Sequence, residues 1–229
     1  MALYAIGDLH LSESVDKPMD VFGGRWDRYT EKIIEEFQKL GPDDICVLCG
    51  DISWGMDIEE AAADFRFIHE LPGKKIILKG NHDYWWTTVT KAKRHLESIG
   101  IDSIDFLHNN CFFYNDAAIC GTRGWFYEQE RGLEHDKKIM LRELGRLETS
   151  LKAAGDFKKY VFLHYPPIYG KYVCPEILSL FEQYGVIKCC YGHIHGKGQR
   201  EAFEGVHGGT TYQMVSADHV SFAPQRILD

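Results

Sequence analysis

The sequence predicts an α/β fold in one domain spanning residues 1–229. In the first half, apolar runs typical of buried strands alternate with stretches of helical periodicity, which favours right-handed crossovers and a parallel sheet. Several short, closely spaced strands in the middle of the chain predict a second sheet. No linker, internal repeat or low-complexity segment interrupts the sequence, so one domain is the simplest organisation.

The most informative stretch runs from Lys75 to Asp83, where a β-branched, apolar run breaks at Gly80 into polar residues. This pattern predicts a buried strand that delivers Asn81, His82 and Asp83 to the loop after its carboxyl end. In open α/β sheets, ligands bind at that edge. The four residues Gly-Asn-His-Asp also fit an ordinary polar turn, so the rest of the chain must decide between these interpretations.

The other elements of the first half repeat this pattern. The apolar run that opens the chain ends at Asp8-Leu9-His10, and on an extended backbone Asp8 and His10 point to the same side. A second run ends at Gly50-Asp51. We expect strands at 3–6, 44–48 and 75–78 and helices at 26–40, 58–71 and 87–99.

The second half begins with three short strands, which Asn109-Asn110 and Asp116 join tightly enough to predict a meander. A long helical stretch follows, and two later apolar runs end in histidines. We expect strands at 104–108, 111–115 and 117–121, a helix at 136–154, and strands at 159–163, 186–191, 199–203 and 210–216.

Composition limits the kinds of partner that the protein can bind and the compartment in which we expect to find it. A net charge of -8 argues against a broad nucleic-acid surface, although small anionic substrates remain compatible with it. The sequence has neither a signal peptide nor an apolar stretch long enough to cross a bilayer, so we expect a cytoplasmic protein without a membrane partner. Its seven cysteines lie mostly in apolar runs, and the pair Cys46 and Cys49 sits in a predicted strand rather than in a redox or zinc turn.

Polar residues follow five predicted strands. Carboxylate, imidazole and amide oxygen together suit Mn, Fe, Zn or Co, whereas a calcium or magnesium site would use mostly oxygen. The set is too large for one catalytic metal with an open position and fits two metals that share a carboxylate. Its members are Asp8 and His10, Asp51, Asn81 and His82, His164, and His193 and His195.

These residues form an ordered set of motifs: Asp8-Leu9-His10, Gly50-Asp51, Gly80-Asn81-His82-Asp83, His164 and Gly192-His193-Ile194-His195. In this order and spacing, the chain resembles the calcineurin-like metallophosphoesterase superfamily from residue 8 to residue 195. The resemblance implies a four-layer α/β/β/α sandwich with a dinuclear metal centre at the strand carboxyl ends.

The resemblance also implies a role for each motif residue. The first metal would be held by Asp8, His10, Asp51 and His195, and the second by Asp51, Asn81, His164 and His193, with Asp51 as the bridge. His82 would face the substrate phosphate as the catalytic residue. We expect two divalent ions per chain, with manganese as the first choice and Fe, Zn, Ni or Co as alternatives.

This centre would hydrolyse phosphate mono- or diesters, because a water that bridges two cations becomes a hydroxide nucleophile at neutral pH. His82 would either protonate the leaving oxygen or hold a non-bridging oxygen. Two alternatives remain: a catalytically silent metal-binding scaffold of the same fold, and a phosphoprotein phosphatase. The protein phosphatase branch carries Asp and Arg where this chain has Trp54 and Gly55, so we favour a small or nucleotide-like substrate.

The lining of the pocket is less constrained by the sequence. Arg123 and Arg25 are candidate phosphate-binding residues, because a guanidinium matches phosphate bidentately, but both also fit solvated loop arginines. Several aromatic residues lie near the predicted site loops and would form either a stacking wall or part of the core: Trp54, Tyr84, Trp85, Trp86, Trp125 and Tyr127.

Overall fold

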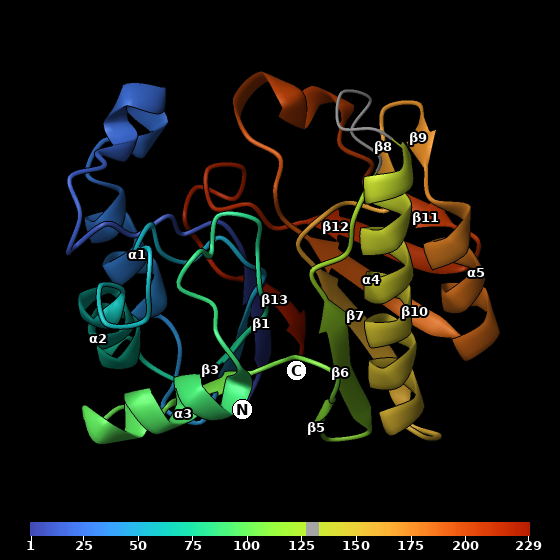
Figure 1. Cartoon of the computed structure of the whole chain (residues 1–229), viewed down its shortest axis with the longest axis horizontal. Coiled ribbons are helices and arrows are strands. Elements are labelled where there is room, and N and C mark those ends of the chain that lie inside the picture. The colour runs from blue at the N-terminus through green and yellow to red at the C-terminus, as the bar shows by residue number, and fades with distance from the viewer. Residues whose placement is uncertain (127–132) are drawn as a thin grey trace.

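The computed structural model describes residues 1–126 and 133–229 and places two β-sheets face to face between two layers of helices (Figure 1). The first sheet has the strand order β13-β1-β2-β3-β4. Four of its strands are parallel, and the C-terminal strand pairs antiparallel with the N-terminal one. The strands are β1 (Leu3–Ile6), β2 (Ile45–Leu48), β3 (Lys74–Ile77), β4 (Ile104–Phe106) and β13 (Gln225–Leu228).

Three helices cover the outer face of this sheet: α1 (Tyr29–Phe37), α2 (Ala62–Glu70) and α3 (Val89–Ser98). Each buries one apolar stripe, as Ile33 and Phe37 do on α1, because its sequence repeats apolar residues at helical spacing. Two short 3₁₀ helices, Met19–Phe22 and Gly24–Trp26, precede α1.

The second sheet has the order β11-β12-β10-β7-β6-β5, with a parallel centre and an antiparallel strand at each edge. Helices α4 (Leu133–Ala153) and α5 (Pro175–Tyr184) cover its outer face. The strands are β5 (Phe112–Tyr114), β6 (Ala117–Thr122), β7 (Lys158–Leu163), β10 (Val186–Tyr191), β11 (Gly205–His207) and β12 (Thr210–Met214). A small hairpin, β8 (Ile168–Tyr169) and β9 (Tyr172–Val173), and a 3₁₀ helix at Gly196–Glu201 complete the described chain.

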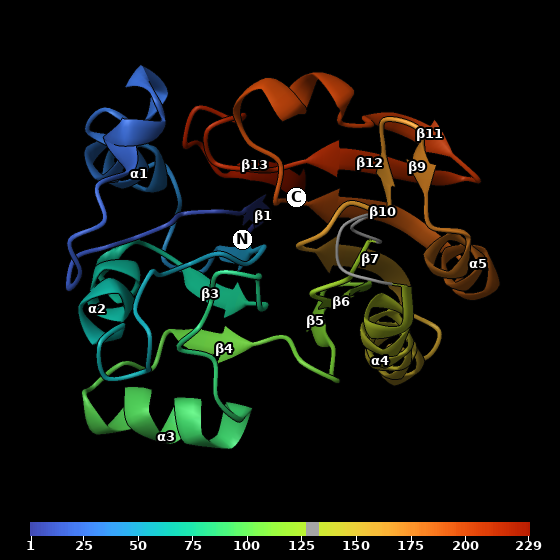
Figure 2. The same cartoon turned by 45° about the horizontal axis from the view of Figure 1, so that its top comes forward.

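A separate apolar core lies between the two sheets. Val47 and Ile76 from the first sheet pack there with Phe162 and Cys190 from the second. Figure 2 shows the strands of the two sheets from another side. At one edge the sheets also bond directly, because the N–H of Gly7 donates to Val215 O at 2.8 Å and the N–H of Ala217 donates to Gly7 O at 2.9 Å. The expected four-layer α/β/β/α arrangement is therefore confirmed.

The predicted meander is wrong. Strand β4 pairs parallel with β3 in the first sheet, whereas β5 and β6 form a hairpin in the second. The crossover through α3 buries Ile104 and Phe106 against the outer helices. The side chain of Asn110 then binds two backbone groups that precede it in the chain, accepting from His108 N and donating to Phe106 O. The chain therefore crosses from the first sheet to the second at Asn109-Asn110, a pair of residues that is also typical of a hairpin turn.

The sequence predicts a strand at 199–203, but residues 199–201 form the second half of the 3₁₀ helix at Gly196–Glu201 instead. Gly196 has a φ of +54°, and the N–H of Gly198 donates to His195 O, so the chain turns directly after the last motif histidine. Further elements that the sequence did not predict are α5, β11, β13 and the β8–β9 hairpin. In the part of the chain that the structure describes, no helix is long and apolar enough to span a membrane.

The loops after β2 and β3 cross at Gly50 and Gly80. Gly50 has a φ of +83°, and a Cβ there would lie 2.7 Å from the Cα of Gly80 and 2.8 Å from Nδ1 of His164. A Cβ on Gly80 would overlap the backbone nitrogen and the carboxylate of Asp51. Both positions therefore need glycine to bring the motif residues together.

We predict that Gly80→Ala lowers the free energy of unfolding by about 1–3 kcal/mol, because the added methyl group forces the two loops apart. Gly145→Ala is the matched control. Gly145 is exposed inside α4, and a Cβ there meets nothing within 4 Å. That variant should gain roughly 0.5–1 kcal/mol of stability from its higher helix propensity. Urea unfolding measures both effects, and a Gly80→Ala protein as stable as the wild type would contradict the crossing.

Candidate metal centre

The structure brings all seven predicted ligands together at the edge where the two sheets join. They follow β1, β2, β3, β7 and β10. Four of them occupy the left-handed region of φ, which Asp and His visit more readily than most residues and which still costs on the order of 1–3 kcal/mol each. These four are Asp8 (φ 60°), His10 (φ 47°), Asp51 (φ 52°) and His193 (φ 74°).

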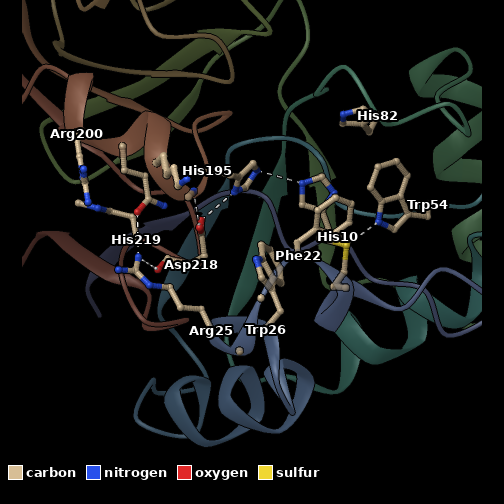
Figure 3. A pocket seen from close by; sticks show the side chains of 16 residues that line it. His10, Phe22, Arg25, Trp26, Trp54, His82, His195, Arg200, Asp218 and His219 are labelled. Atoms are coloured by element: carbon tan, nitrogen blue, oxygen red, sulfur yellow. Dashed lines mark hydrogen bonds and ion pairs between the residues drawn. The ribbon is translucent and has the colours of Figure 1, made fainter.

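The first group comprises Asp8, His10 and His195, whose ligand atoms all lie within 4.8 Å of one another. Nε2 of His10 is 3.3 Å from Nε2 of His195, which in turn lies 3.8 Å from Oδ1 of Asp8. Nδ1 of His195 donates to Oδ1 of Asp218 at 2.8 Å, as Figure 3 shows. This hydrogen bond fixes the orientation of the ring and aims Nε2 at the group.

The second group comprises Asp51, His164 and His193, with Asn81 beside them. Oδ1 of Asn81 is 2.6 Å from Nε2 of His164 and 2.9 Å from Nδ1 of His193. Nδ1 of His164 donates to the carbonyl of Cys49 at 3.0 Å. Since that nitrogen carries the proton, the lone pair of Nε2 points into the group and is available to a metal.

Asp51 lies between the two groups. Its Oδ2 is 3.8 Å from Nε2 of His10 and 3.5 Å from Nε2 of His164. Its Oδ1 accepts from the backbone N–H of His82 at 2.7 Å. One carboxylate is therefore within reach of both groups, which is the geometry expected of a shared ligand.

Burial makes this cluster electrostatically unfavourable as it stands. Burial raises the pKa of Asp8 to about 8, and the nearby charge of Asp51 acts in the same direction. Burial lowers the pKa of His164 to about 3, so this imidazole is neutral at physiological pH. Burial opposes the charged form of His195, but the bond to Asp218 and the charge of Asp8 raise its pKa to about 9. Divalent cations fit this donor set, because they favour ionised carboxylates and use neutral imidazole lone pairs.

A further carboxylate, Asp83, holds the loops in place without joining either group. It is fully buried and accepts from the N–H groups of Asp51 at 3.0 Å, Ile52 at 2.8 Å and Gly80 at 2.7 Å. The indole of Trp85 donates to it as well. Burial, together with the charge of Asp51, raises the pKa of Asp83 to about 7. Asp83 therefore positions the loops that carry Asp51 and Asn81.

His82 lies beside the centre and lines a cavity of about 780 Å³. Its ring centroid is 4.6 Å from that of Trp54 and 5.8 Å from that of His10. Burial lowers its pKa, although the charge of Asp51 works in the opposite direction. His82 therefore lies next to the predicted ligands and on the wall of the cavity.

The two candidate phosphate-binding arginines have different surroundings. Arg123 pairs with the buried Glu143 at 3.5 Å and lies over Trp125, and it does not line the cavity. Arg25 does line the cavity, with Nη1 donating to Oε1 of Gln199 at 3.1 Å. Arg25 is therefore the better placed of the two to meet a substrate.

Most of the candidate aromatic wall belongs to the core. Trp85, Trp86 and Trp125 pack among other aromatic rings or buried acids, whereas Trp54 lines the cavity. The ring of Trp54 is covered by His10 on one side, 5.0 Å away and nearly parallel, and Nζ of Lys17 lies 3.3 Å from its centroid. Tyr84 is exposed, with its hydroxyl 3.4 Å from Nδ1 of His82. Tyr127 lies outside the described residues.

Sequence reasoning missed Asp218 and the cavity residues Phe22, Trp26 and Arg200. Asp218 comes four residues after β12 ends, and β12 mixes polar and apolar residues, so the apolar run that marked the other strand exits is absent here. Phe22 and Trp26 lie on the 3₁₀ helices before α1, where no regular periodicity separates wall residues from solvent-facing ones.

Comparison of the fold with solved structures shows distant likenesses over nearly the whole chain. Phosphopantetheinyl hydrolase from Mycobacterium tuberculosis aligns with a TM-score of 0.63 and 14% identity, covering 99% of this chain and 95% of that one. A protein of unknown function from Aquifex aeolicus aligns with a TM-score of 0.51 and 16% identity, covering 98% and 95%. TT1561 of Thermus thermophilus aligns with a TM-score of 0.51 and 16% identity, covering 86% and 84%. No curated protein matches the sequence.

The family comparison is more direct. Residues 1–197 match the family model described as calcineurin-like phosphoesterase, and this range contains all seven predicted ligands and His82. The fold and the two candidate metal-binding groups agree with that match. The chain therefore belongs to the calcineurin-like phosphoesterase family and is a metal-dependent phosphoric ester hydrolase.

Proposed function

We propose that the chain binds two divalent metal ions, with Asp51 as a shared ligand, and hydrolyses phosphate mono- or diesters of small, nucleotide-like substrates. The observation that carries this proposal is the place of Asp51, whose Oδ2 is 3.8 Å from His10 and 3.5 Å from His164. Manganese is our first choice of metal, and Fe, Zn, Ni or Co also suit imidazole and carboxylate donors.

The side chains of the site have different roles around the reacting phosphate. Two bound cations would supply a water of lowered pKa and neutralise negative charge on the phosphoryl oxygens. Asp8, Asp51, Asn81 and the four ligand histidines would hold the ions, and Asp83 keeps the two ligand loops at a fixed separation. His82, on the cavity wall, either donates a proton to the leaving oxygen or donates a hydrogen bond to a non-bridging oxygen.

The alternatives have less support. A silent scaffold of this fold would tolerate the loss of ligands, yet all seven predicted ligands converge here. A phosphoprotein phosphatase would use an Arg at the position of Gly55, where even a Cβ would lie 2.7 Å from the backbone nitrogen of Ala61. Trp54 fills the neighbouring position by stacking on His10. A small-molecule substrate therefore suits this site better.

We also propose a cytoplasmic location and a small phosphorylated substrate as the partner, without stable binding of nucleic acid or membrane. All seven cysteines are free and six of them are buried, which supports a reducing compartment. The net charge of -8 disfavours a nucleic-acid surface. The oligomeric state stays open.

The direct test of the proposed function is an assay of the manganese-loaded protein against nucleotides, cyclic nucleotides, bis-aryl phosphodiesters, sugar phosphates and a phosphopeptide. We predict higher kcat/KM for the diesters and nucleotide-like esters than for the phosphopeptide. Efficient dephosphorylation of the phosphopeptide, with little action on the small esters, would instead favour the phosphoprotein phosphatase.

Metal content tests the shared ligand. Elemental analysis after reconstitution should give more than one equivalent per chain for the wild type. Asp51→Asn should lower occupancy of both sites, because the shared carboxylate loses its charge, whereas His10→Ala should chiefly lower one. Asp102→Asn, at an exposed residue, is the control and should bind metal normally. An Asp51→Asn protein that binds two metals and turns over normally would exclude the bridging role.

The role of His82 is tested by the leaving group. If His82 is the general acid, His82→Ala should lose roughly 10²–10⁴-fold in rate on alkyl or ribosyl esters, the usual range for acid–base catalysis, and much less on nitrophenyl esters. The wild-type rate on alkyl esters should then also fall as the pH rises through the pKa of His82. If His82 instead holds a non-bridging oxygen, His82→Ala should slow the hydrolysis of both classes of ester by a similar factor.

His207→Ala, at an exposed histidine of β11, is the control and should change the rate on neither class of ester. Loss of metal from His82→Ala would mean that His82 is a ligand.

A further inference from the structure

The cavity beside the metal centre is larger than a phosphate group requires. Its volume of about 780 Å³ lies within the usual range for sites that enclose a small molecule. Figure 3 shows Trp54 and His82 on one side of His195, and Arg25 and Arg200 on the other. The lining therefore continues well past the metal ligands, to a second region of different chemistry.

This second region is cationic. Arg25, Lys197 and Arg200 all line it, in a chain whose net charge is -8. The hydrogen bonds of Arg25 go to neutral oxygens, Oε1 of Gln199 at 3.1 Å and the carbonyl of Asp218 at 3.4 Å. Within residues 1–126 and 133–229, neither Lys197 nor Arg200 forms an ion pair. We call Arg25, Lys197 and Arg200 the cationic end of the cavity.

One acidic side chain lies close enough to Arg25 to interact with its charge. Asp218 is the single carboxylate among the lining residues of the described chain. Its oxygens accept from Nδ1 of His195 at 2.8 Å and from the N–H of Gly196 at 3.2 Å. Because Asp218 already has these partners, the cationic end retains positive charge for a ligand.

An apolar surface lies between the two ends. Phe22, on the first 3₁₀ helix, is 64% exposed and lines the cavity, and the buried Trp26 lines it as well. The ring of Trp54 is covered by His10 and Lys17, so Phe22 offers the free aromatic surface. An exposed aromatic side chain beside a functional site favours contact with an apolar or planar ligand.

We propose that the substrate is a phosphate ester with a planar or apolar body and, beyond it, a second phosphate group bound by Arg25 and Arg200. This inference rests on the proposed function, because it assigns the scissile phosphate to the metal centre. The body packs against Phe22. The second phosphate is not cleaved, since no predicted metal ligand lies at the cationic end.

The test uses adenosine 3′,5′-bisphosphate and adenosine 5′-monophosphate as competitors of p-nitrophenyl phosphate hydrolysis by the manganese-loaded protein. Each charge-assisted contact should contribute roughly a tenfold difference in affinity. The wild type should therefore bind the bisphosphate at least about tenfold more tightly than the monophosphate. Tryptophan fluorescence gives a second measurement of affinity that does not depend on turnover, because Trp26 and Trp54 line the cavity.

Arg200→Ala should reduce the preference for the bisphosphate roughly tenfold, and the double variant with Arg25→Ala should abolish it. Arg200 makes no side-chain hydrogen bond in the described part of the chain, so its replacement leaves the packing intact. Arg142→Ala removes an exposed arginine from α4 and is the matched control, with an unchanged preference. Phe22→Ala should weaken both nucleotides relative to inorganic phosphate.

The outcomes separate this inference from the proposed function. If the protein hydrolyses p-nitrophenyl phosphate but binds both nucleotides equally, or if the double variant keeps the preference, the cationic end does not bind a second phosphate. If fluorescence shows the preference and its loss in the double variant, but no phosphate ester is hydrolysed, the binding assignment holds and the proposed function fails.

Discussion

One buried carboxylate, Asp83, determines how the two loops at the centre of the site are arranged. It accepts hydrogen bonds from the backbone of both loops and from the indole of Trp85, at distances of 2.7–3.0 Å. Gly50 and Gly80 allow the loops to approach closely enough for these bonds to form. Without this junction, Asp51 and Asn81 would not face His164 and His193, because they follow separate strands.

The cost of burying the cluster explains why cations belong there. Asp8 and His164 are both fully buried, and burial moves their pKa values in opposite directions, to about 8 and about 3. A buried carboxylate that shares its site with another is destabilised unless a positive charge is close to both. A neutral imidazole such as that of His164, with its lone pair turned inward, supplies a ligand without supplying that charge. Divalent ions satisfy both requirements.

Sequence patterns predicted the parallel sheet and the residues that converge, because a strand exit is a local signal and parallel strands end at a common edge. Asp8, Asp51, Asn81 and His164 all follow apolar runs, and the structure brings them together. The sequence could not show which sheet β4 joins, since Asn109-Asn110 fits both a hairpin turn within one sheet and a connection from one sheet to the other. Arg25 and Phe22 meet the cavity from two short 3₁₀ helices, so their neighbours depend on tertiary packing that no periodicity encodes.

The central claim is that two metal ions share Asp51, and anomalous diffraction from crystals grown with manganese tests it most directly. The account predicts two anomalous peaks about 3.5–4 Å apart. One peak should lie beside Asp8, His10 and His195, the other beside Asn81, His164 and His193, with the Asp51 carboxylate within about 2.0–2.2 Å of both. A single peak, or two peaks of which only one contacts Asp51, would contradict it.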